Sequence, residues 1–441
     1  MPPLNGGRIG AALPPLNTNR IIAVMPSRES IERQLLARDK PARWGSRTIL
    51  PDYAGYSIAN LPSWIERLFG LDGPKSPLTQ IASALPPSEH VVLLILDGLG
   101  YRKAESLFER FPDLVLRSLG EGGLYFPLTS VFPSTTVAAL ASIGTGLTPL
   151  EHGLVGYRLY LRETSAITNM VRFAMVGNAK SDAAFAAGLG AETLVPSPTV
   201  QERLANRGVD VHTLLPQYIA ASGLSRALYR GSRQLHAVAG LSDMLVAARQ
   251  LLHRATTTTF LSLYWPGLDA IAHIRGPESE AYVAEMRAID DAIRRELVGR
   301  VNNTLLVVSS DHGFVPMRPD DYVRLRDAGD VEDALLLPPV GEPRASYLYV
   351  REGTRESVSR SLDRRLEDGL VCVDSGTLIE DRLLGEGTPH PEITARVGDL
   401  AVVATGSGGI YHPYHDAVLL RGMHGGLTED EMLVPLIASP L

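Results

Sequence analysis

Short apolar runs of strand length recur along the chain, at residues 91–96, 259–265 and 304–309. A run of this length without alternating polar positions is typical of a strand buried on both faces of a sheet. Helical spacing of apolar residues follows two of these runs, at residues 103–111 and 278–297. The repeated order of strand and helix predicts an α/β fold with a mostly parallel central sheet flanked by helices.

The segments around these runs have different patterns. Residues 1–85 form an N-terminal lead-in in which residues 56–71 have helical spacing. Beyond residue 336 the chain changes to short strands and one charged amphipathic helix, expected at 345–350, 355–367, 370–373 and 399–404. A small α+β cap inserted into the core explains this change. The predicted units are therefore the lead-in (1–85), the first part of the α/β core (86–335), the cap (336–404) and the last part of the core (405–441), which resumes at an apolar run at 417–420.

The composition is that of an ordinary globular protein, with 45% hydrophobic and 21% charged residues among 441. A net charge of −7 disfavours non-specific attraction to phosphate backbones, so no stable nucleic-acid binding is expected. Anionic substrates stay compatible with this charge, because bound cations would reverse it locally. The single cysteine, Cys372, excludes an intramolecular disulfide and a cysteine-based zinc cluster, and its apolar neighbours predict a core position.

No segment has the pattern of a membrane or secretory sequence. Residues 1–30 lack the continuous apolar stretch of a secretory signal, and no run of 18 apolar residues occurs. These two observations predict a cytoplasmic protein without a membrane span. The sequence does not determine the oligomeric state.

Acidic and histidine side chains occur where predicted strands end or where glycines permit a tight turn. Carboxyl ends of strands are where open α/β sheets place their ligands. Taken singly, each residue is explained equally well as a turn cap, a solvated side chain or a loop residue. Together they offer oxygen and nitrogen ligands without sulfur, which favours Zn²⁺, with Mn²⁺ or Fe²⁺ as alternatives. The set is sufficient for two metal ions with three protein ligands each: Asp97, Asp269, His273, Asp311, His312 and His424.

A candidate nucleophile lies between the first two of these ligand positions. Residues 137–143 are small and apolar, as in a buried helix, and Thr135 or Thr136 occupies its N-cap. Amide groups and the helix dipole at such a start attract phosphate. No Gly-x-Ser-x-Gly turn is present, so a bound metal is the economical way to activate a threonine hydroxyl. The alternative is plain N-capping without chemistry.

Several strings in this chain match one known family in order and spacing. They are LDGLG at 96–100, FPSTTVAALASIGTGLTPLEHG at 132–153, GLDAIAHIRGP at 267–277, SDHGF at 310–314 and MHGG at 423–426. From about residue 90 to the C-terminus the chain resembles the alkaline phosphatase superfamily, in particular its type I phosphodiesterase and nucleotide pyrophosphatase branch. The resemblance implies an alkaline phosphatase-like fold and a two-metal hydrolase that cleaves phosphodiester or pyrophosphate bonds in a small phosphorylated substrate.

The resemblance also implies roles for individual residues. The family's nucleophile lies nine residues before the threonine of a Thr-Gly pair, which here points to Thr136, counted from Thr145. A covalent phospho-threonine intermediate would form on it, and water would release the intermediate. One ion would be held by Asp97, Thr136, Asp311 and His312, and the other by Asp269, His273 and His424.

One departure from the family pattern concerns substrate binding. Members of this branch carry an asparagine shortly after the His-Gly turn, whereas residues 154–158 contain none, so Tyr157 or a backbone N–H is expected to replace it. The ending HGGLTEDEMLVPL also resembles superfamily proteins of the PglZ type. A phosphomonoesterase, a phosphonate hydrolase, a phosphomutase and a PglZ-type partner protein therefore remain alternatives. Three further histidines are interpreted as structural or loop residues: His152, His412 and His415.

Overall fold

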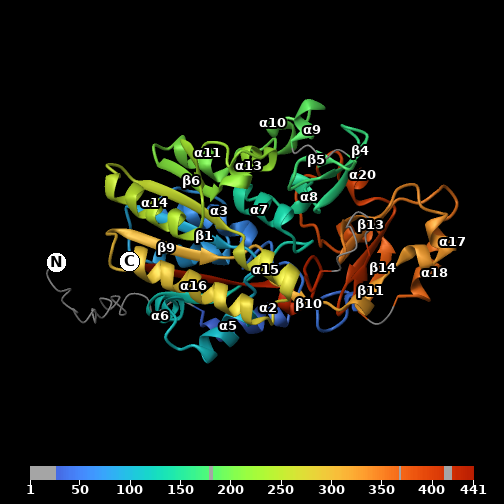
Figure 1. Cartoon of the computed structure of the whole chain (residues 1–441), viewed down its shortest axis with the longest axis horizontal. Helices are drawn as coiled ribbons and strands as arrows, with labels where there is room; N and C mark the ends of the chain where they lie inside the picture. The colour runs from blue at the N-terminus through green and yellow to red at the C-terminus, as the bar shows by residue number, and fades with distance from the viewer. Residues whose placement is uncertain (1–25, 178–181, 367–368, 412–419) are drawn as a thin grey trace.

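The computed structural model describes residues 26–177, 182–366, 369–411 and 420–441 (Figure 1). Within these ranges two sheets of seven strands each form the framework of the molecule. Most of the first 30 residues, the two histidines His412 and His415, and residues 417–419 of the predicted apolar run lie outside the described residues.

The central sheet is built around the three apolar runs. β1 (His90–Leu96) lies between β8 (Thr259–Trp265) and β9 (Thr304–Ser309), and the three strands run parallel. The order across the sheet is β2-β18-β9-β1-β8-β6-β7, and among these strands only β18 (Leu433–Pro440) runs opposite to the rest. The predicted α/β fold with a mostly parallel, helix-flanked sheet is confirmed, and β18 makes the sheet mixed.

Four strands of this sheet were not predicted from the apolar pattern. β2 (Leu124–Thr129) and β18 pair at one side, and β6 (Asp210–Pro216) and β7 (Gln234–Val238) lie at the other. Leu420, the described residue of the run expected to resume the core, is not in a strand, and the chain re-enters the sheet through β18 instead.

Helices pack on both faces of the central sheet because the side chains of β1 alternate between two apolar clusters (Figure 1). The predicted helices at 103–111 and 278–297 are α5 (Tyr101–Arg110) and α16 (Glu280–Glu296). They share one face with α6 (Val115–Gly122) and α14 (Leu241–Arg254), while the other face carries α3 (Leu61–Leu68), α7 (Thr136–Thr145), α11 (Val200–Ala205) and α13 (Gly223–Leu228).

The lead-in segment packs into the core rather than onto its surface. Its predicted helix consists of η2 (Ile58–Asn60) and α3, and the Trp64 side chain is fully buried. Thr129 of β2 bridges Ser57 of this segment. The part of the lead-in at residues 57–68 therefore belongs to the face that carries α7.

The second sheet has the order β14-β15-β13-β12-β3-β4-β5 and lies at the right of Figure 1. Four of its strands come from the segment predicted to be a cap: β12 (Val340–Glu342), β13 (Ala345–Leu348), β14 (Leu370–Asp374) and β15 (Leu400–Ala404). β12 was not predicted as a strand, and neither were the other three, which follow the nucleophile segment: β3 (Arg158–Leu161), β4 (Ala166–Asn169) and β5 (Ala174–Met175). The predicted charged helix is α18 (Arg355–Asp363), and Cys372 on β14 is half-buried rather than in the core.

None of the described helices is both long enough and apolar enough to cross a membrane. The cytoplasmic location remains a prediction.

Candidate metal centre

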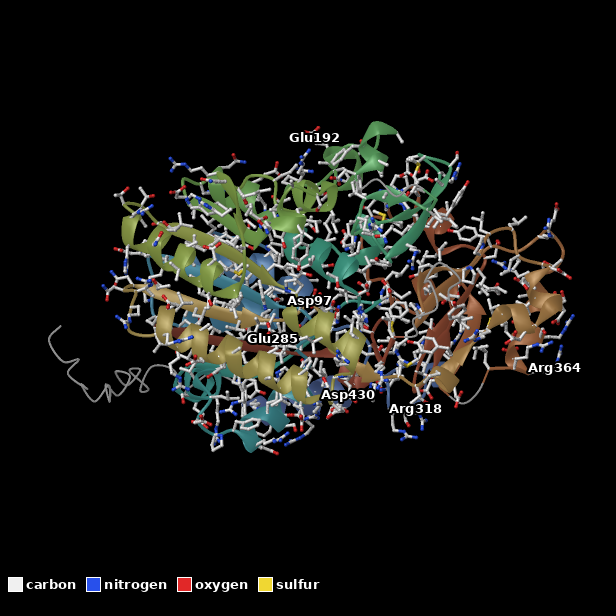
Figure 2. The ribbon with its side chains drawn as sticks, in the orientation of Figure 1. Asp97, Glu192, Glu285, Arg318, Arg364 and Asp430 are labelled. Atoms are coloured by element: carbon white, nitrogen blue, oxygen red, sulfur yellow. The ribbon has the colours of Figure 1, made fainter. Side chains whose placement is uncertain are left out.

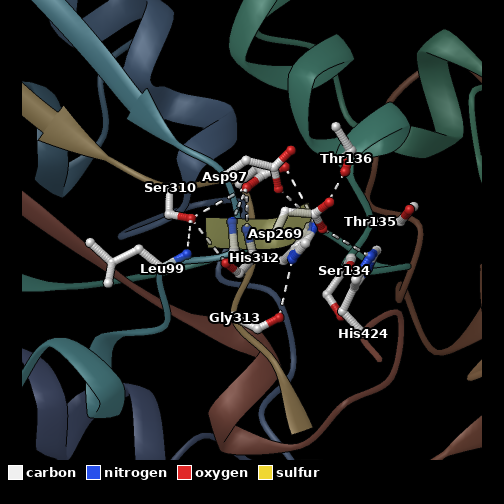
Figure 3. Close-up of polar contacts among 12 residues, drawn as sticks. Asp97, Leu99, Ser134, Thr135, Thr136, Asp269, Ser310, His312, Gly313 and His424 are labelled. Carbon is white, nitrogen blue, oxygen red and sulfur yellow. Dashed lines mark hydrogen bonds and ion pairs between the residues drawn. The ribbon is translucent and has the colours of Figure 1, made fainter. Parts of the chain in front are cut away.

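Three of the predicted ligands meet at the carboxyl edge of the central sheet (Figure 3). Asp97 directly follows β1, and Asp311 and His312 follow the neighbouring strand β9. Because these strands run parallel, their ends bring the side chains together. His312 Nε2 lies 3.5 Å from Asp97 Oδ1 and 3.4 Å from Asp311 Oδ2, and all three side chains are buried.

The other three predicted ligands adjoin this group. Asp269 and His273 lie one turn apart on α15 (Gly267–Arg275), which follows β8, and His424 comes from the loop after β17 (Gly422–Met423). Asp269 Oδ1 lies 3.3 Å from His273 Nε2 and 3.8 Å from His424 Nε2. The rings of His424 and His312 stack with centroids 3.6 Å apart, so the two groups form one cluster.

Two glycines permit this approach of the chain to itself. A Cβ added to Gly98, whose φ is +79°, would lie 2.6 Å from the Phe314 ring and 3.2 Å from Asp269 Cα. A Cβ added to Gly313 would lie 2.0 Å from the carbonyl oxygen of Asp430. The glycines of the two Asp-containing strings are thus needed for backbone packing around the cluster.

The spacing of the six side chains fits the dimensions of metal sites. Ligand atoms at about 2.0–2.2 Å from a tetrahedral zinc ion lie about 3.3–3.6 Å from one another. The separations within each group cover the range 3.3–3.8 Å. Two sets of side chains are close enough for each set to share an ion: Asp97 with Asp311 and His312, and Asp269 with His312 and His424.

Each of the three imidazoles has one nitrogen bound to a backbone carbonyl. Nδ1 of His273 bonds to the carbonyl of Gly422 over 2.9 Å, and Nδ1 of His424 to that of Ser134 over 3.0 Å. Nδ1 of His312 bonds to the carbonyl of Gly313 over 3.1 Å. A carbonyl oxygen only accepts, so Nδ1 carries a proton in all three rings, and Nε2 is the nitrogen that faces the carboxylates. This is the usual arrangement of histidines that bind metals.

Three carboxylate oxygens of the cluster are buried without a hydrogen-bond donor among the described residues: Asp97 Oδ1, Asp269 Oδ1 and Asp311 Oδ2. Burial raises the pKa of Asp97 well above its ordinary value, and the charges of Asp269 and Asp311 raise it further. Burial also holds the pKa of His424 well below its ordinary value, so its ring is neutral. For His273 the charge of Asp269 outweighs burial and raises the pKa. Three acidic groups, each with a buried carboxylate oxygen, thus lie in one cluster, and a divalent cation would offset their negative charge.

Thr136 points its hydroxyl toward this cluster. It is the first residue of α7, whose remaining nine residues, 137–145, are all buried, while Thr136 itself is half-buried. Its Oγ1 lies 3.2 Å from His312 Nε2, within hydrogen-bond distance. The nucleophile candidate therefore lies where a helix N-terminus and a ligand nitrogen meet.

The neighbouring Thr135 occupies the N-cap position, but its hydroxyl does not cap the helix. It donates instead to Oε1 of Glu342 over 2.6 Å. The backbone amide of Tyr157, the predicted substrate-binding residue, donates to the same oxygen over 2.7 Å. Through Glu342 the Tyr157 backbone is thus linked to the segment that carries Thr136.

Three residues near the cluster were not found from the sequence. Glu342 ends β12 with 4% exposure, and Tyr264 on β8 donates its hydroxyl to Asp97 Oδ2. Tyr218 is 74% exposed, and partial burial of its hydroxyl with the charges of Asp97 and Asp269 raises its pKa. Of these, Tyr264 had a signal in the sequence, as a phenol hydroxyl near the end of the strand that precedes Asp269.

His152 has the structural role expected for it. It is fully buried, lies 3.1 Å from Ser142 Oγ and accepts a hydrogen bond from the amide of Leu154. It therefore holds the turn after α7 and does not join the cluster.

Comparison with known families gives one match across most of the chain. A model described as type I phosphodiesterase / nucleotide pyrophosphatase matches residues 91–427. These residues include all six candidate metal ligands and Thr136.

Similar solved structures have the same fold at low sequence identity. Murine ectonucleotide pyrophosphatase / phosphodiesterase 5, in an inactive threonine-to-alanine variant with AMP, has a TM-score of 0.61 and 17% identity over 79% of this chain and 87% of that chain. Phosphonoacetate hydrolase from Sinorhizobium meliloti 1021, with phosphonoformate, has a TM-score of 0.58 and 19% identity over 79% of this chain and 89% of that chain.

A short stretch of the chain is also similar to a subunit of the V-type proton ATPase from Schizosaccharomyces pombe. The two are 31% identical over 108 residues, which are 24% of this chain. The match spans 20% of that protein's length, too little to indicate a shared function.

Proposed function

The chain belongs to the type I phosphodiesterase / nucleotide pyrophosphatase family, and we propose that it is a metal-dependent hydrolase of phosphodiester or pyrophosphate bonds in a small phosphorylated substrate. The observation that carries this proposal is the cluster of six candidate ligand side chains, one of which, His312, contacts the hydroxyl of Thr136. The fold shared with a pyrophosphatase / phosphodiesterase and with a phosphonate hydrolase supports hydrolysis at phosphorus.

Two ions fit the six side chains, and their oxygen and nitrogen ligands favour Zn²⁺. Asp97, Asp311 and His312 would hold one ion with Thr136, and the second would be held by Asp269, His273 and His424. When bound, the ions would neutralise charge on the phosphoryl oxygens and favour the alkoxide form of a coordinated hydroxyl. Two observations support this assignment. Three buried carboxylate oxygens have no hydrogen-bond donor among the described residues, and Nδ1 of each of the three histidines bonds to a backbone carbonyl.

Thr136 is the proposed nucleophile. Its oxygen would attack phosphorus, the ester or pyrophosphate oxygen on the opposite side would leave, and a phospho-threonine would result. The helix start at Thr136 has no side-chain cap, so the first amides of α7 are available to the phosphoryl oxygens. Water would then cleave the phospho-threonine and restore the hydroxyl.

Tyr218 is the proposed contact for the leaving group. An aromatic side chain that is 74% exposed offers a face on which a nucleobase can stack. Partial burial and the charges of Asp97 and Asp269 raise the pKa of its hydroxyl. The exposed ring favours a nucleotide over a small aliphatic ester.

The proposal is tested with purified, zinc-loaded protein and the variant Thr136→Ala. Wild type should turn over a nitrophenyl diester or a dinucleotide, and Thr136→Ala should lose at least roughly 1,000-fold in kcat while keeping its metal content. Thr164→Ala, on the turn after β3, is the matched control and should behave as wild type. Turnover of phosphonoacetate with no diester turnover would assign a phosphonate hydrolase instead. Wild-type rates in Thr136→Ala would exclude the covalent mechanism.

A further inference from the structure

Glu342 lies beside the nucleophile segment without belonging to either ligand group. It comes from the second sheet, and its side chain is almost fully buried, with 4% exposure. Its Oε1 accepts hydrogen bonds from Thr135 Oγ1 over 2.6 Å and from the amide of Tyr157 over 2.7 Å. Two donors converging on one oxygen fix the position of this carboxyl group.

Three neighbours of Glu342 belong to chain segments that carry candidate site residues. Thr135 precedes the nucleophile, and Tyr157 lies in the segment predicted to bind a phosphate oxygen. Gly425 follows His424 and packs so closely on Glu342 that a Cβ on this glycine would lie 3.0 Å from the Glu342 Cβ. The carboxyl group is therefore held against residues that directly adjoin Thr136 and His424 in the chain.

The charge of Glu342, rather than its hydrogen bonds, distinguishes it from a merely structural residue. A glutamine oxygen could accept both hydrogen bonds equally well. Burial raises the pKa of Glu342 to about 7, although the two hydrogen bonds and the charges of Arg158 and His273 act to lower it. Above this pH the group is a buried anion near the substrate site, and like charges repel more strongly there than in water.

We propose that Glu342 selects substrates whose phosphoryl group carries a single negative charge. A diester has one charge, because its second ester bond replaces one anionic oxygen, whereas a monoester is a dianion above about pH 7. The extra charge of a monoester would face the Glu342 carboxylate. This inference rests on the proposed function and narrows it to diesters and to the singly charged phosphoryl groups inside a pyrophosphate chain.

The first test compares turnover of bis(4-nitrophenyl) phosphate with that of 4-nitrophenyl phosphate at about pH 8.5 in wild type and Glu342→Gln. The ratio of kcat/KM for diester over monoester should fall about tenfold in the variant, mainly because monoester turnover rises. Glu192→Gln, at the surface far from Asp97 in Figure 2, is the control and should keep the wild-type ratio. A ratio within twofold of wild type would overturn the proposal, and so would an equal loss on both substrates.

The second test needs no turnover. Calorimetry on zinc-loaded Thr136→Ala, with and without Glu342→Gln, measures binding of AMP and of its phosphate methyl ester. The glutamine should tighten binding of the dianionic AMP about tenfold and leave binding of the singly charged ester unchanged. Equal effects on both ligands, or none, would refute the charge selection. If wild type hydrolyses neither ester, the proposed function fails, while this binding comparison still decides the role of Glu342.

Discussion

Glu431 and Arg344 form a fully buried ion pair, and the substitution Glu431→Gln tests its contribution to stability. Arg344 Nε and Nη2 donate to the two carboxylate oxygens over 2.6 and 2.7 Å, and both side chains are 0% exposed. Glu431 also accepts from the amide of Gly426, two residues after His424. The pair therefore fastens the loop that carries His424 to the start of β13.

Glutamine keeps the shape of Glu431 but removes its charge, which leaves the guanidinium of Arg344 buried without a counter-ion. Removing one partner of a buried pair costs about 3–5 kcal/mol. That cost is a large share of a total stability of roughly 5–15 kcal/mol. Glu429 is a matched control because its carboxylate pairs with Arg102 at the surface, so Glu429→Gln should cost at most about 1 kcal/mol.

Urea unfolding followed by tryptophan fluorescence measures both variants against wild type. The expected result is a loss of at least about 3 kcal/mol for Glu431→Gln and a clearly smaller loss for Glu429→Gln. Loss of the ion pair should also shift the loop that carries His424, which would lower the zinc content that remains after dialysis. A Glu431→Gln variant that unfolds within about 1 kcal/mol of wild type would refute the reasoning, because Arg344 would then not need its partner.

Three further predictions concern single side chains. Tyr264→Phe removes the donor to Asp97 and should weaken zinc binding about 10- to 100-fold in a chelator competition, whereas unchanged affinity would contradict a supporting role. Tyr218→Ala should raise KM for a dinucleotide about tenfold and leave KM for inorganic pyrophosphate unchanged, and equal changes would exclude base stacking. Burial, with the charges of His390 and Arg396, lowers the pKa of His152 to about 3. Near pH 5 only the unfolded state therefore binds a proton on this ring, and the free energy of unfolding decreases as the pH falls. From pH 7 to 5 this loss should be about 2 kcal/mol in urea unfolding, and His152→Gln should lack it.

The metal ligands could be predicted because their positions follow from a repeated pattern. A continuous apolar run such as residues 91–96 predicts a buried parallel strand, and the residue after such a strand lies at the ligand edge of the sheet. This reasoning places Asp97, Asp311 and His312 side by side without any knowledge of the loops. The helical spacing of Asp269 and His273 likewise depends on local geometry alone.

The missed strands lack such a pattern for identifiable reasons. β18 contains Pro435, which usually excludes a central strand because proline donates no ladder hydrogen bond. In the structure Pro435 faces Pro127 of the edge strand β2, and the pairing of β18 with β9 begins only at Ile437. The proline therefore lies where no donor to β9 is required, a circumstance visible only in three dimensions.

Glu342 was missed for a different reason, since its importance comes from residues distant in the chain. Nothing in the sequence relates position 342 to Thr135, and β12 has only three residues, too few for a periodic signal. The same turn between β12 and β13 also supplies Arg344, which holds the His424 loop through Glu431. None of these turn residues belongs to a ligand group, because the ligands come from strand ends, α15 and the His424 loop. A substitution at Glu342 that keeps its hydrogen bonds should therefore change substrate preference at constant metal content, whereas a substitution at Arg344 should change metal content as well. Such a separation would mean that substrate selection and metal binding, although adjacent in space, depend on different parts of the chain.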